Sequence, residues 1–242
     1  MMRLQTASAA RNLSMGCQAG PDPLVFGRMQ SGKDREEEPT DRDGFRFRGG
    51  HPALDLTATL QGRLKGSPRE LLAEPEDLAR WLASAGLASS DVACDPSAVR
   101  VARELREAIH QLVHAHLAGA RPPDRARKVL NQVARRGSAP RQLSAEGEVS
   151  LAGDALQRLA FVANEAIALL GGTDRGRLRK CGNEGCAILF VDLSRSGARR
   201  WCSMAACGNR HKVAEFRRRQ PRAAGKALSE RRRWRPGAAR AK

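Results

Sequence analysis

The chain has 242 residues, of which 41% are hydrophobic and 29% are charged, and its formal net charge is +17. This length and composition suffice for one substantial hydrophobic core and a small additional module. The pattern excludes a membrane-spanning helix, because nowhere do about 18 apolar residues follow one another. It also lacks the apolar run of a secretory signal peptide near the N-terminus. We therefore expect a cytoplasmic protein that does not bind membranes.

The positive charge is concentrated toward the C-terminus. Residues 175–242 carry 20 Lys and Arg against 4 Asp and Glu, whereas residues 1–174 carry 23 against 22. A concentrated basic segment is typical of a protein that binds a polyanion. The alternative is a solvated basic tail without a partner.

The N-terminal segment shows little sign of folded structure. Residues 1–43 have no periodic apolar pattern and include the charge run KDREEEPTDRD, so we expect a disordered extension. A short strand is predicted over residues 45–48. A helix is expected to start at Pro52, because proline favours the first helical turn, and its core contacts would be Leu54, Leu56 and Leu60.

Three amphipathic helices are predicted next. The segment EPEDLARWLASAGL has Pro75 in its first turn and one apolar face. Residues 96–118 form the longest helix, since apolar residues recur at spacings of mostly three and four. The segment RPPDRARKVLNQVARRG begins with prolines and ends at Gly137. The expected core residues of these helices are Leu78, Trp81, Leu82, Ala102, Leu105, Ile109, Leu112, Val113, Leu117, Val129, Leu130 and Val133.

A hairpin and another helix complete a predicted helical domain at residues 44–172. The apolar runs around Leu143 and Val149 flank a Glu146-Gly147 turn, a pattern that favours a β-hairpin. Residues 154–170 are expected to form a helix that ends at Gly171-Gly172. Its predicted apolar stripe contains Leu156, Leu159, Ala163, Ile167 and Leu170.

The chemistry of this helical domain is not legible from the sequence. His110 and His114 have the i, i+4 spacing of a metal pair on a helix, but no third ligand is marked, so surface or boundary histidines are favoured. We find no Gly-rich phosphate loop and no catalytic set of residues, and we expect no enzyme. A domain of this kind could bind an unknown small molecule or pair two copies of the chain.

Four cysteines carry the clearest signal in the chain. Four residues separate Cys181 from Cys186, and four separate Cys202 from Cys207. This spacing is close to that of structural zinc sites. Because a cytosol keeps thiols reduced, disulfides are disfavoured, and a redox pair or buried free thiols remain as alternatives. Four thiolates fill the tetrahedral shell of Zn²⁺, so the sequence predicts one structural zinc ion.

The residues around these cysteines predict a compact basic module at residues 177–219. A strand is expected at residues 188–191, with the first cysteine pair on a knuckle between residues 178–180 and that strand. A turn is expected at SRSG, and a helix that starts at Ser203 or Gly208 and ends at Arg219. Val213 and Phe216 share a helix face that we expect to pack on the zinc site. The negative charge of the thiolates would be offset by Arg179, Lys180, Arg199 and Arg200.

A family resemblance appears at this point. The pattern RLRKC....C..LF.D.SR...RRWCSM..CGNR.K in residues 177–212 resembles the CGNR zinc finger. GGHPALDL and the helices after it are similar to the ABATE-type domain that precedes this finger in bacterial stress-induced transcription regulators. The chain departs from that family at Thr57-Ala58-Thr59, where Val-Asn-Thr is expected. The resemblance implies a mainly helical, sensor-like domain joined to a DNA-binding finger.

We therefore expect a mainly α protein with small β-hairpins, a C-terminal four-cysteine zinc module, and a disordered basic tail at residues 220–242. The predicted function is a DNA-binding transcription regulator, with double-stranded DNA as partner and the helical domain as a ligand-sensing or dimerisation unit. An RNA-associated binding module is the alternative. The predicted nucleic-acid contacts are Arg199, Arg200, Arg210, Lys212, Arg217, Arg218 and Arg219.

Overall fold

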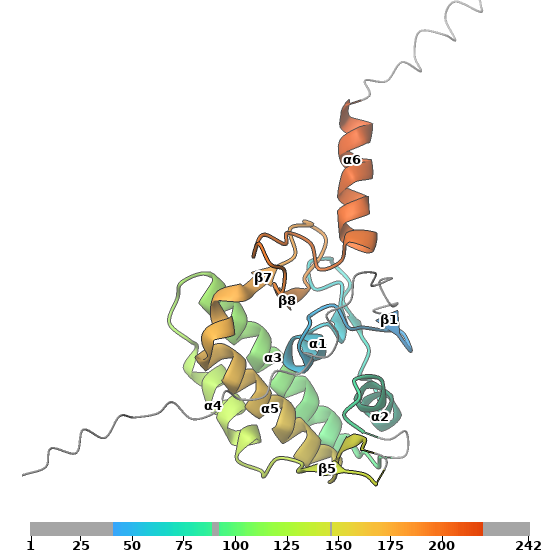
Figure 1. The fold of residues 1–242 in the computed structure, drawn as a ribbon, viewed down its shortest axis with the longest axis vertical. Coiled ribbons are helices and arrows are strands. Elements are labelled where there is room, and N and C mark those ends of the chain that lie inside the picture. The colour runs from blue at the N-terminus through green and yellow to red at the C-terminus, as the bar shows by residue number, and fades with distance from the viewer. Residues whose placement is uncertain (1–40, 89–91, 146, 220–242) are drawn as a thin grey trace, which may run out of the picture. The chain divides into compact units, whose positions relative to one another are not determined.

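The computed structural model describes residues 41–88, 92–145 and 147–219 (Figure 1). Most of the expected N-terminal extension and the basic tail at residues 220–242 lie outside the described residues. Strand β1 (Asp41–Arg42) pairs with β2 (Phe45–Arg46) across a turn in which Asp43 and Gly44 have positive φ. The first strand therefore forms inside the segment predicted to be disordered, because it closes a hairpin that the short strand prediction left unpaired.

The mainly helical fold with small antiparallel hairpins is confirmed, since the described strands form two-stranded sheets only. The elements follow the predicted order closely. After β2 they are α1 (Pro52–Thr57), β3 (Leu60–Gln61), β4 (Arg69–Glu70), α2 (Pro75–Ser84), α3 (Pro96–Leu117), α4 (Asp124–Ala134), β5 (Arg141–Leu143), β6 (Val149–Leu151), α5 (Ala155–Gly171), η1 (Thr173–Arg177), β7 (Leu178–Lys180), β8 (Leu189–Val191), η2 (Met204–Gly208) and α6 (Asn209–Arg219).

Local signals start the helices where the sequence predicts them. The Asp95 side chain accepts a hydrogen bond from the Ala98 amide and caps α3, and Asp154 forms a capping box with Gln157 at the start of α5. Helices α3, α4 and α5 pack together, with α1 against α3 and α5. Their shared core includes Trp81, Leu105 and other fully buried side chains.

Two predicted core positions are wrong. Leu117 at the end of α3 is 37% exposed, and Ile167 in α5 is 38% exposed. The buried face of α5 instead continues through Ala166 and Leu169. The reason is that α5 contacts α1, α3 and α4, so its buried face follows several neighbours rather than one straight stripe.

A buried ion network fixes the β3–β4 hairpin against α3. Arg106 is only 3% exposed and donates two hydrogen bonds to the Glu70 carboxylate, at 2.6 and 2.7 Å. It also donates to Glu107, which accepts two further hydrogen bonds from Arg63. Bidentate pairs of an arginine with a carboxylate stabilise the fold and also fix the relative orientation of the two side chains. The hairpin is thereby held in place beside the C-terminal module.

Strand β8 joins two hydrophobic cores. Leu189 and Val191 belong to the helical core, whereas Ile188 and Phe190 pack in a second core that contains the four paired cysteines. Successive side chains of a strand point to opposite faces, so one strand serves both cores. Figure 1 shows β7 and β8 between the helices and α6. The helical core therefore includes side chains of β7 and β8, which follow the boundary predicted near Gly172.

Candidate metal centre and nucleic-acid interface

The structure brings the four predicted cysteine ligands together. Their sulfur atoms all lie within 4.8 Å of one another, and all four residues are buried. The Sγ atoms of Cys186 and Cys202 are 3.9 Å apart, and those of Cys202 and Cys207 are 3.7 Å apart. A tetrahedron with Zn–S distances of about 2.3 Å requires S···S separations of about 3.8 Å. The ligand set therefore has the dimensions of a four-thiolate zinc site.

Backbone hydrogen bonds hold each cysteine pair in a tight turn. The Cys181 amide donates to the Ile188 carbonyl at 3.0 Å, and the Cys186 amide donates to the Asn183 carbonyl at 2.8 Å. The Cys207 amide donates to the Ser203 carbonyl at 3.0 Å, while the Ser203 hydroxyl accepts from the Ala206 amide. Because the backbone sets these turns, the thiols are oriented for a common ligand.

The thiols influence one another's pKa values strongly. Hydrogen bonds from Cys186 and Cys202 hold the pKa of Cys181 below its ordinary value. Burial and the nearby Cys186 and Cys181 thiolates raise the pKa of Cys207 to about 11. The raised pKa of Cys207 disfavours full ionisation of the group at neutral pH when no cation is bound. A divalent cation supplies the charge that allows all four thiolates to form.

One cation beside the thiols comes from the N-terminal hairpin and was not predicted. Arg48 donates two hydrogen bonds to Asp41, at 2.9 and 2.6 Å, and lies beside Cys202. Although burial acts to lower it, the pKa of Arg48 is raised by Asp41 and Cys202. Of the predicted cations, Arg179 instead donates to the carbonyls of Gly176 and Leu178. Only the fold could show that residue 48 reaches this module.

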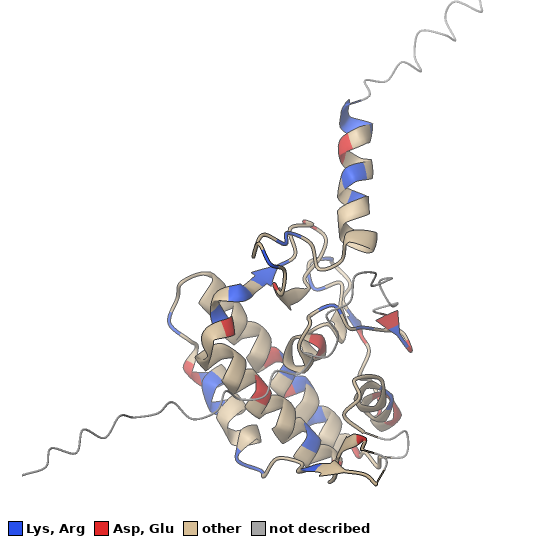
Figure 2. Ribbon diagram, viewed as in Figure 1, with Lys and Arg blue, Asp and Glu red and all other residues tan. Residues whose placement is uncertain are grey.

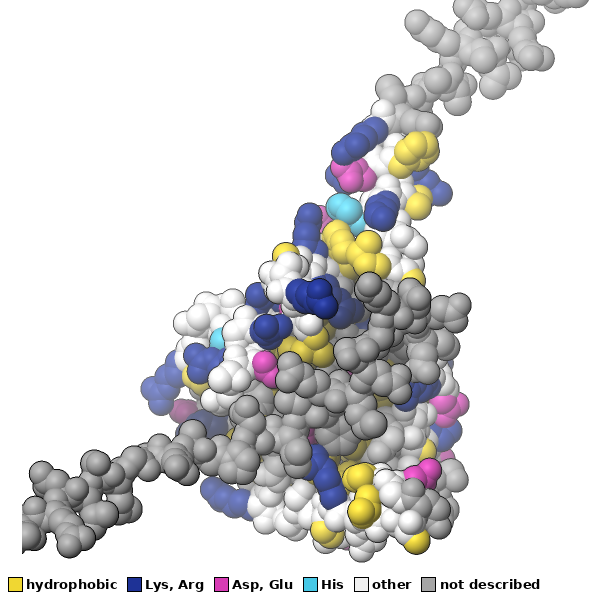
Figure 3. All heavy atoms as spheres, viewed as in Figure 1, with side chains coloured by type: hydrophobic (Ala, Val, Ile, Leu, Met, Phe, Trp, Pro, Cys, Tyr) yellow, Lys and Arg dark blue, Asp and Glu magenta, His cyan; other side chains and the backbone are white. Residues whose placement is uncertain are grey.

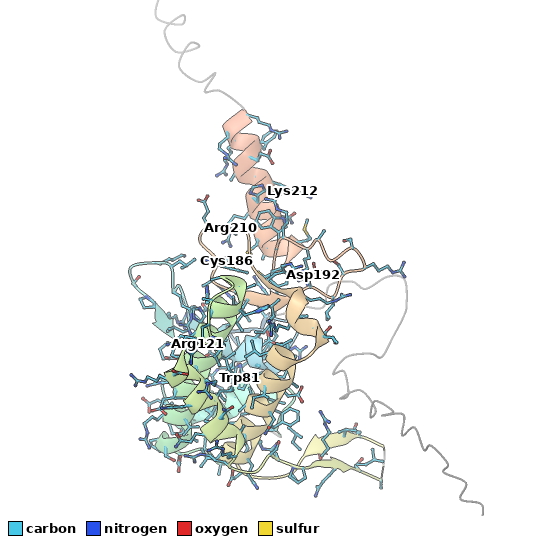
Figure 4. The ribbon with its side chains drawn as sticks, turned by 90° about the vertical axis from the view of Figure 1, so that its left-hand side faces the viewer. Trp81, Arg121, Cys186, Asp192, Arg210 and Lys212 are labelled. Atoms are coloured by element: carbon cyan, nitrogen blue, oxygen red, sulfur yellow. The ribbon has the colours of Figure 1, made fainter. Side chains whose placement is uncertain are left out.

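Asp192 organises the loop between the two cysteine pairs (Figure 4). Its fully buried carboxylate accepts hydrogen bonds from the Ser194 amide, the Ser194 hydroxyl and the Arg199 amide. Burial acts to raise its pKa, but these hydrogen bonds hold the pKa below its ordinary value. Arg199 then directs its guanidinium to the carbonyls of Trp201 and Cys202. This loop is therefore fixed by side-chain hydrogen bonds rather than by a longer strand.

Gly208 allows the second cysteine turn to pack closely on Trp201. A Cβ atom at this position would lie 2.8 Å from the Met204 sulfur and 3.3 Å from Trp201 Cδ1. The ring of His211 lies 4.6 Å from that of Trp201, centroid to centroid. Trp201 thus contacts both the turn and the first residues of α6.

Helix α6 forms as predicted but is anchored differently. It contains no buried residue, and Val213 and Phe216 are 48% and 61% exposed. The prediction that these two residues pack on the zinc site is wrong, because Trp201 and His211 make the contact at the base of the helix. Figure 1 shows α6 extending away from the rest of the described chain.

Five of the seven predicted nucleic-acid contacts lie on α6. Figure 2 shows their positive charge along the helix, with one acidic position between them. Glu215 accepts a hydrogen bond from Arg219 and lies near His211. Within the described residues, no acidic side chain pairs with the other four, which are Arg210, Lys212, Arg217 and Arg218. The remaining two, Arg199 and Arg200, lie in the loop before Cys202, where Arg200 stacks over Trp201.

Two family models match the chain. Residues 177–220 match the CGNR zinc finger, and residues 50–173 match ABATE, described as "Putative stress-induced transcription regulator". The chain belongs to the ABATE family. No curated protein matches it. An ABATE domain followed by this finger fits a regulator with a structural zinc site, and the four clustered cysteines are the ligand set of one structural zinc ion.

The ABATE domain itself offers no second metal centre among the residues described. His110 and His114 have ring centroids 4.4 Å apart, and burial together with Arg63 lowers the pKa of His110 to about 4. The four cysteines are the one group of three or more metal-binding side chains found in the described ranges. No described helix of this ABATE protein is long and apolar enough to cross a membrane.

Proposed function

We propose that this ABATE protein is a DNA-binding transcription regulator in which the CGNR finger presents α6 to a duplex. The observation that carries the proposal is an eleven-residue helix with no buried side chain, held at one end by a zinc module. Its four cations without acidic partners among the described residues have no role in packing. Exposed Lys and Arg side chains on a projecting helix suit contacts to phosphates and to the major groove.

Duplex DNA is favoured over single-stranded RNA by the placement of the aromatic residues. Single-strand recognition uses exposed aromatic rings on which bases stack. In the finger, Phe190 and Trp201 are buried in the zinc core, and Phe216 is the one aromatic side chain of residues 177–219 that is exposed. This distribution supports recognition by charge and groove fit.

The ABATE domain is proposed to act as a non-enzymatic ligand-sensing or dimerisation unit that modulates the finger. Its core shares strand β8 with the zinc core, so a change in one core would alter the packing of the other. Binding of a small molecule or of a second chain to the ABATE domain would thereby change the packing at the base of α6. The family description supports a role in a stress response; a bacterial source and a cytoplasmic location are part of the proposal.

The proposal is tested by immunoprecipitation of the full chain, followed by sequencing of the bound nucleic acid after separate DNase and RNase treatment. We expect DNase to remove the enriched fragments and RNase to leave them. The variant R217A/R218A should lose the enrichment, whereas R125A/R136A, which removes two exposed charges from and beside α4, should retain it. Enrichment that only RNase abolishes would favour the RNA-binding alternative.

A further inference from the structure

A basic cavity of about 410 Å³ lies between the ABATE domain and the zinc module. Its walls come from β2, the end of α1, the β3–β4 hairpin, the two cysteine turns and the first turn of α6. Arg210 and Cys186, which both line it, lie at the base of α6 in Figure 4. The volume falls within the range of about 300–1,000 Å³ typical of small-molecule sites.

The positive charge of the cavity wall is only partly compensated, by the carboxylates of Asp41 and Glu107 and by the zinc-ligand thiols Cys186 and Cys207 in the lining. Six lining residues are cations and none is acidic; the cations are Arg46, Arg48, Arg63, Lys65, Arg69 and Arg210. Two of these are held by carboxylates, since Arg48 pairs with Asp41 and Arg63 with Glu107. Across the described part of the chain, the other four have no acidic partner. Like charges gathered around one cavity repel one another until an anion enters.

The hydrogen-bonding groups of the wall also suit an anion. Arg63 leaves its buried Nε–H without an acceptor among the described residues. Thr57, Gln61 and Ser67 add neutral polar side chains to the lining. The guanidinium group presents several N–H donors in a planar fork that matches phosphate oxygens. Figure 3 shows Lys and Arg side chains along α6 and around its base.

We propose that this cavity binds a small polyanion that carries phosphate groups. Duplex phosphates are a weaker fit, because a duplex presents them on a convex surface, whereas these cations surround a hollow. Arg46 and Arg69 belong to hairpins of the ABATE side, and Arg210 belongs to α6, so one ligand would contact both. The role of this ligand as a regulatory signal rests on the proposed function, whereas the binding of the ligand to the cavity does not.

The test is isothermal titration of the zinc-loaded full chain with inorganic pyrophosphate at constant ionic strength. We expect saturable binding at one site per chain. The variant R46A/R69A should weaken it by about tenfold or more, since two charge-assisted contacts are lost. The control R125A/R136A removes the same charge from and beside α4 and should leave the affinity unchanged. K65A/R69A, which changes two exposed residues at the cavity, should weaken binding even if Arg46 proves necessary for folding.

Three outcomes would overturn the proposal. They are no saturable binding by wild type, equal weakening in the cavity and control variants, and a loss of duplex affinity in R46A/R69A without any binding of pyrophosphate. The last result would assign the cavity to DNA phosphates. If wild type binds pyrophosphate at the cavity but does not bind duplex DNA, the proposed function fails while this site stands.

Discussion

The Val191 amide donates a hydrogen bond of 2.9 Å to the Gly49 carbonyl and so ties β8, the strand between the two cysteine pairs, to the glycine pair before α1. The Gly49 amide in turn donates to the buried Asp55 carboxylate at 2.7 Å. A Cβ atom on Gly49 would lie 2.7 Å from Leu54 Cβ, so only glycine fits this approach. Gly49, one residue before the matched ABATE segment, thus contacts both α1 and the finger strand β8, and its close approach to α1 leaves no room for a side chain.

The first prediction concerns this shared packing. C207S should lower the free energy of unfolding of the ABATE helices as well as that of the finger, by roughly 4 kcal/mol or more, because β8 loses its support on one face. Far-ultraviolet circular dichroism, to which the ABATE helices α1–α5 contribute most of the described helical residues, measures the helical core. The control C94S changes a half-buried cysteine outside the cluster. A helical transition that stays at its wild-type midpoint in C207S would show that the two segments unfold independently.

The second prediction is the metal content. Protein purified without added metal should hold one zinc per chain by elemental analysis, since four buried thiols lie within 4.8 Å of one another. After a chelator removes the ion, all four thiols should become reactive toward a thiol reagent. Rebinding of zinc should then release protons from these thiols. A zinc content near zero in protein with an intact α-helical spectrum would contradict the prediction.

The third prediction concerns the glycine of the second cysteine turn. G208A should destabilise the finger only mildly, by about 1 kcal/mol, because its Cβ would lie 2.8 Å from the sulfur of the exposed, flexible Met204, which can move aside, and 3.3 Å from Trp201 Cδ1. The double variant G208A/M204A removes the overlapping side chain and should recover part of the loss. Thermal unfolding monitored together with zinc release compares the three proteins. Equal destabilisation in both variants would mean that the contact with Trp201, at 3.3 Å, is the limiting one.

The fourth prediction is a pH dependence centred on Asp55. Burial raises its pKa from 3.8 to about 7, so the folded chain favours the protonated carboxyl. This stabilisation is complete below pH 3.8 and is lost as the pH rises to about 7, with an upper bound of about 4 kcal/mol. His51 acts in the opposite sense, because burial lowers its pKa from 6.5 to about 4 and stability falls as the pH drops through that interval.

The variant D55N isolates the contribution of this carboxyl, since the amide oxygen can still accept from Gly49. Denaturant unfolding should show D55N gaining stability relative to wild type between pH 5 and pH 8. H51Q serves as the comparison for the opposite slope. A difference between D55N and wild type that is the same at both pH values would show that Asp55 does not titrate in this range.

Prediction from sequence succeeded where the signal is local. The helix starts at Pro52, Pro75 and Pro96, the helix over residues 154–170 and the hairpin around Leu143 and Val149 all follow from neighbouring residues. The cysteine spacing likewise predicted the metal ligands. It failed where the partner is remote: an apolar pair on α6 suggests burial, but nothing in the sequence shows that the base of the helix is already filled by Trp201.

The basic cavity could not be predicted for the same reason. Arg46 and Arg69 lie in the part of the chain whose net charge is close to zero, so the charge count drew attention only to the C-terminal segment. The fold brings these residues beside Arg210, more than 140 positions away in sequence. Similarly, Arg48 reaches Cys202 only because the β1–β2 hairpin lies against the zinc module.

Duplex binding as a function of salt tests the central claim most directly. For wild type, the logarithm of the affinity should fall linearly with the logarithm of the salt concentration, with a slope of about −0.9 per phosphate contact. R217A/R218A should flatten this slope by up to about two contacts, because neither arginine has an acidic partner in the described ranges, whereas Arg219 is paired with Glu215. R125A/R136A should keep the wild-type slope. Wild-type binding that does not respond to salt, or the same slope in wild type and R217A/R218A, would contradict the assignment of α6 as a DNA-binding helix.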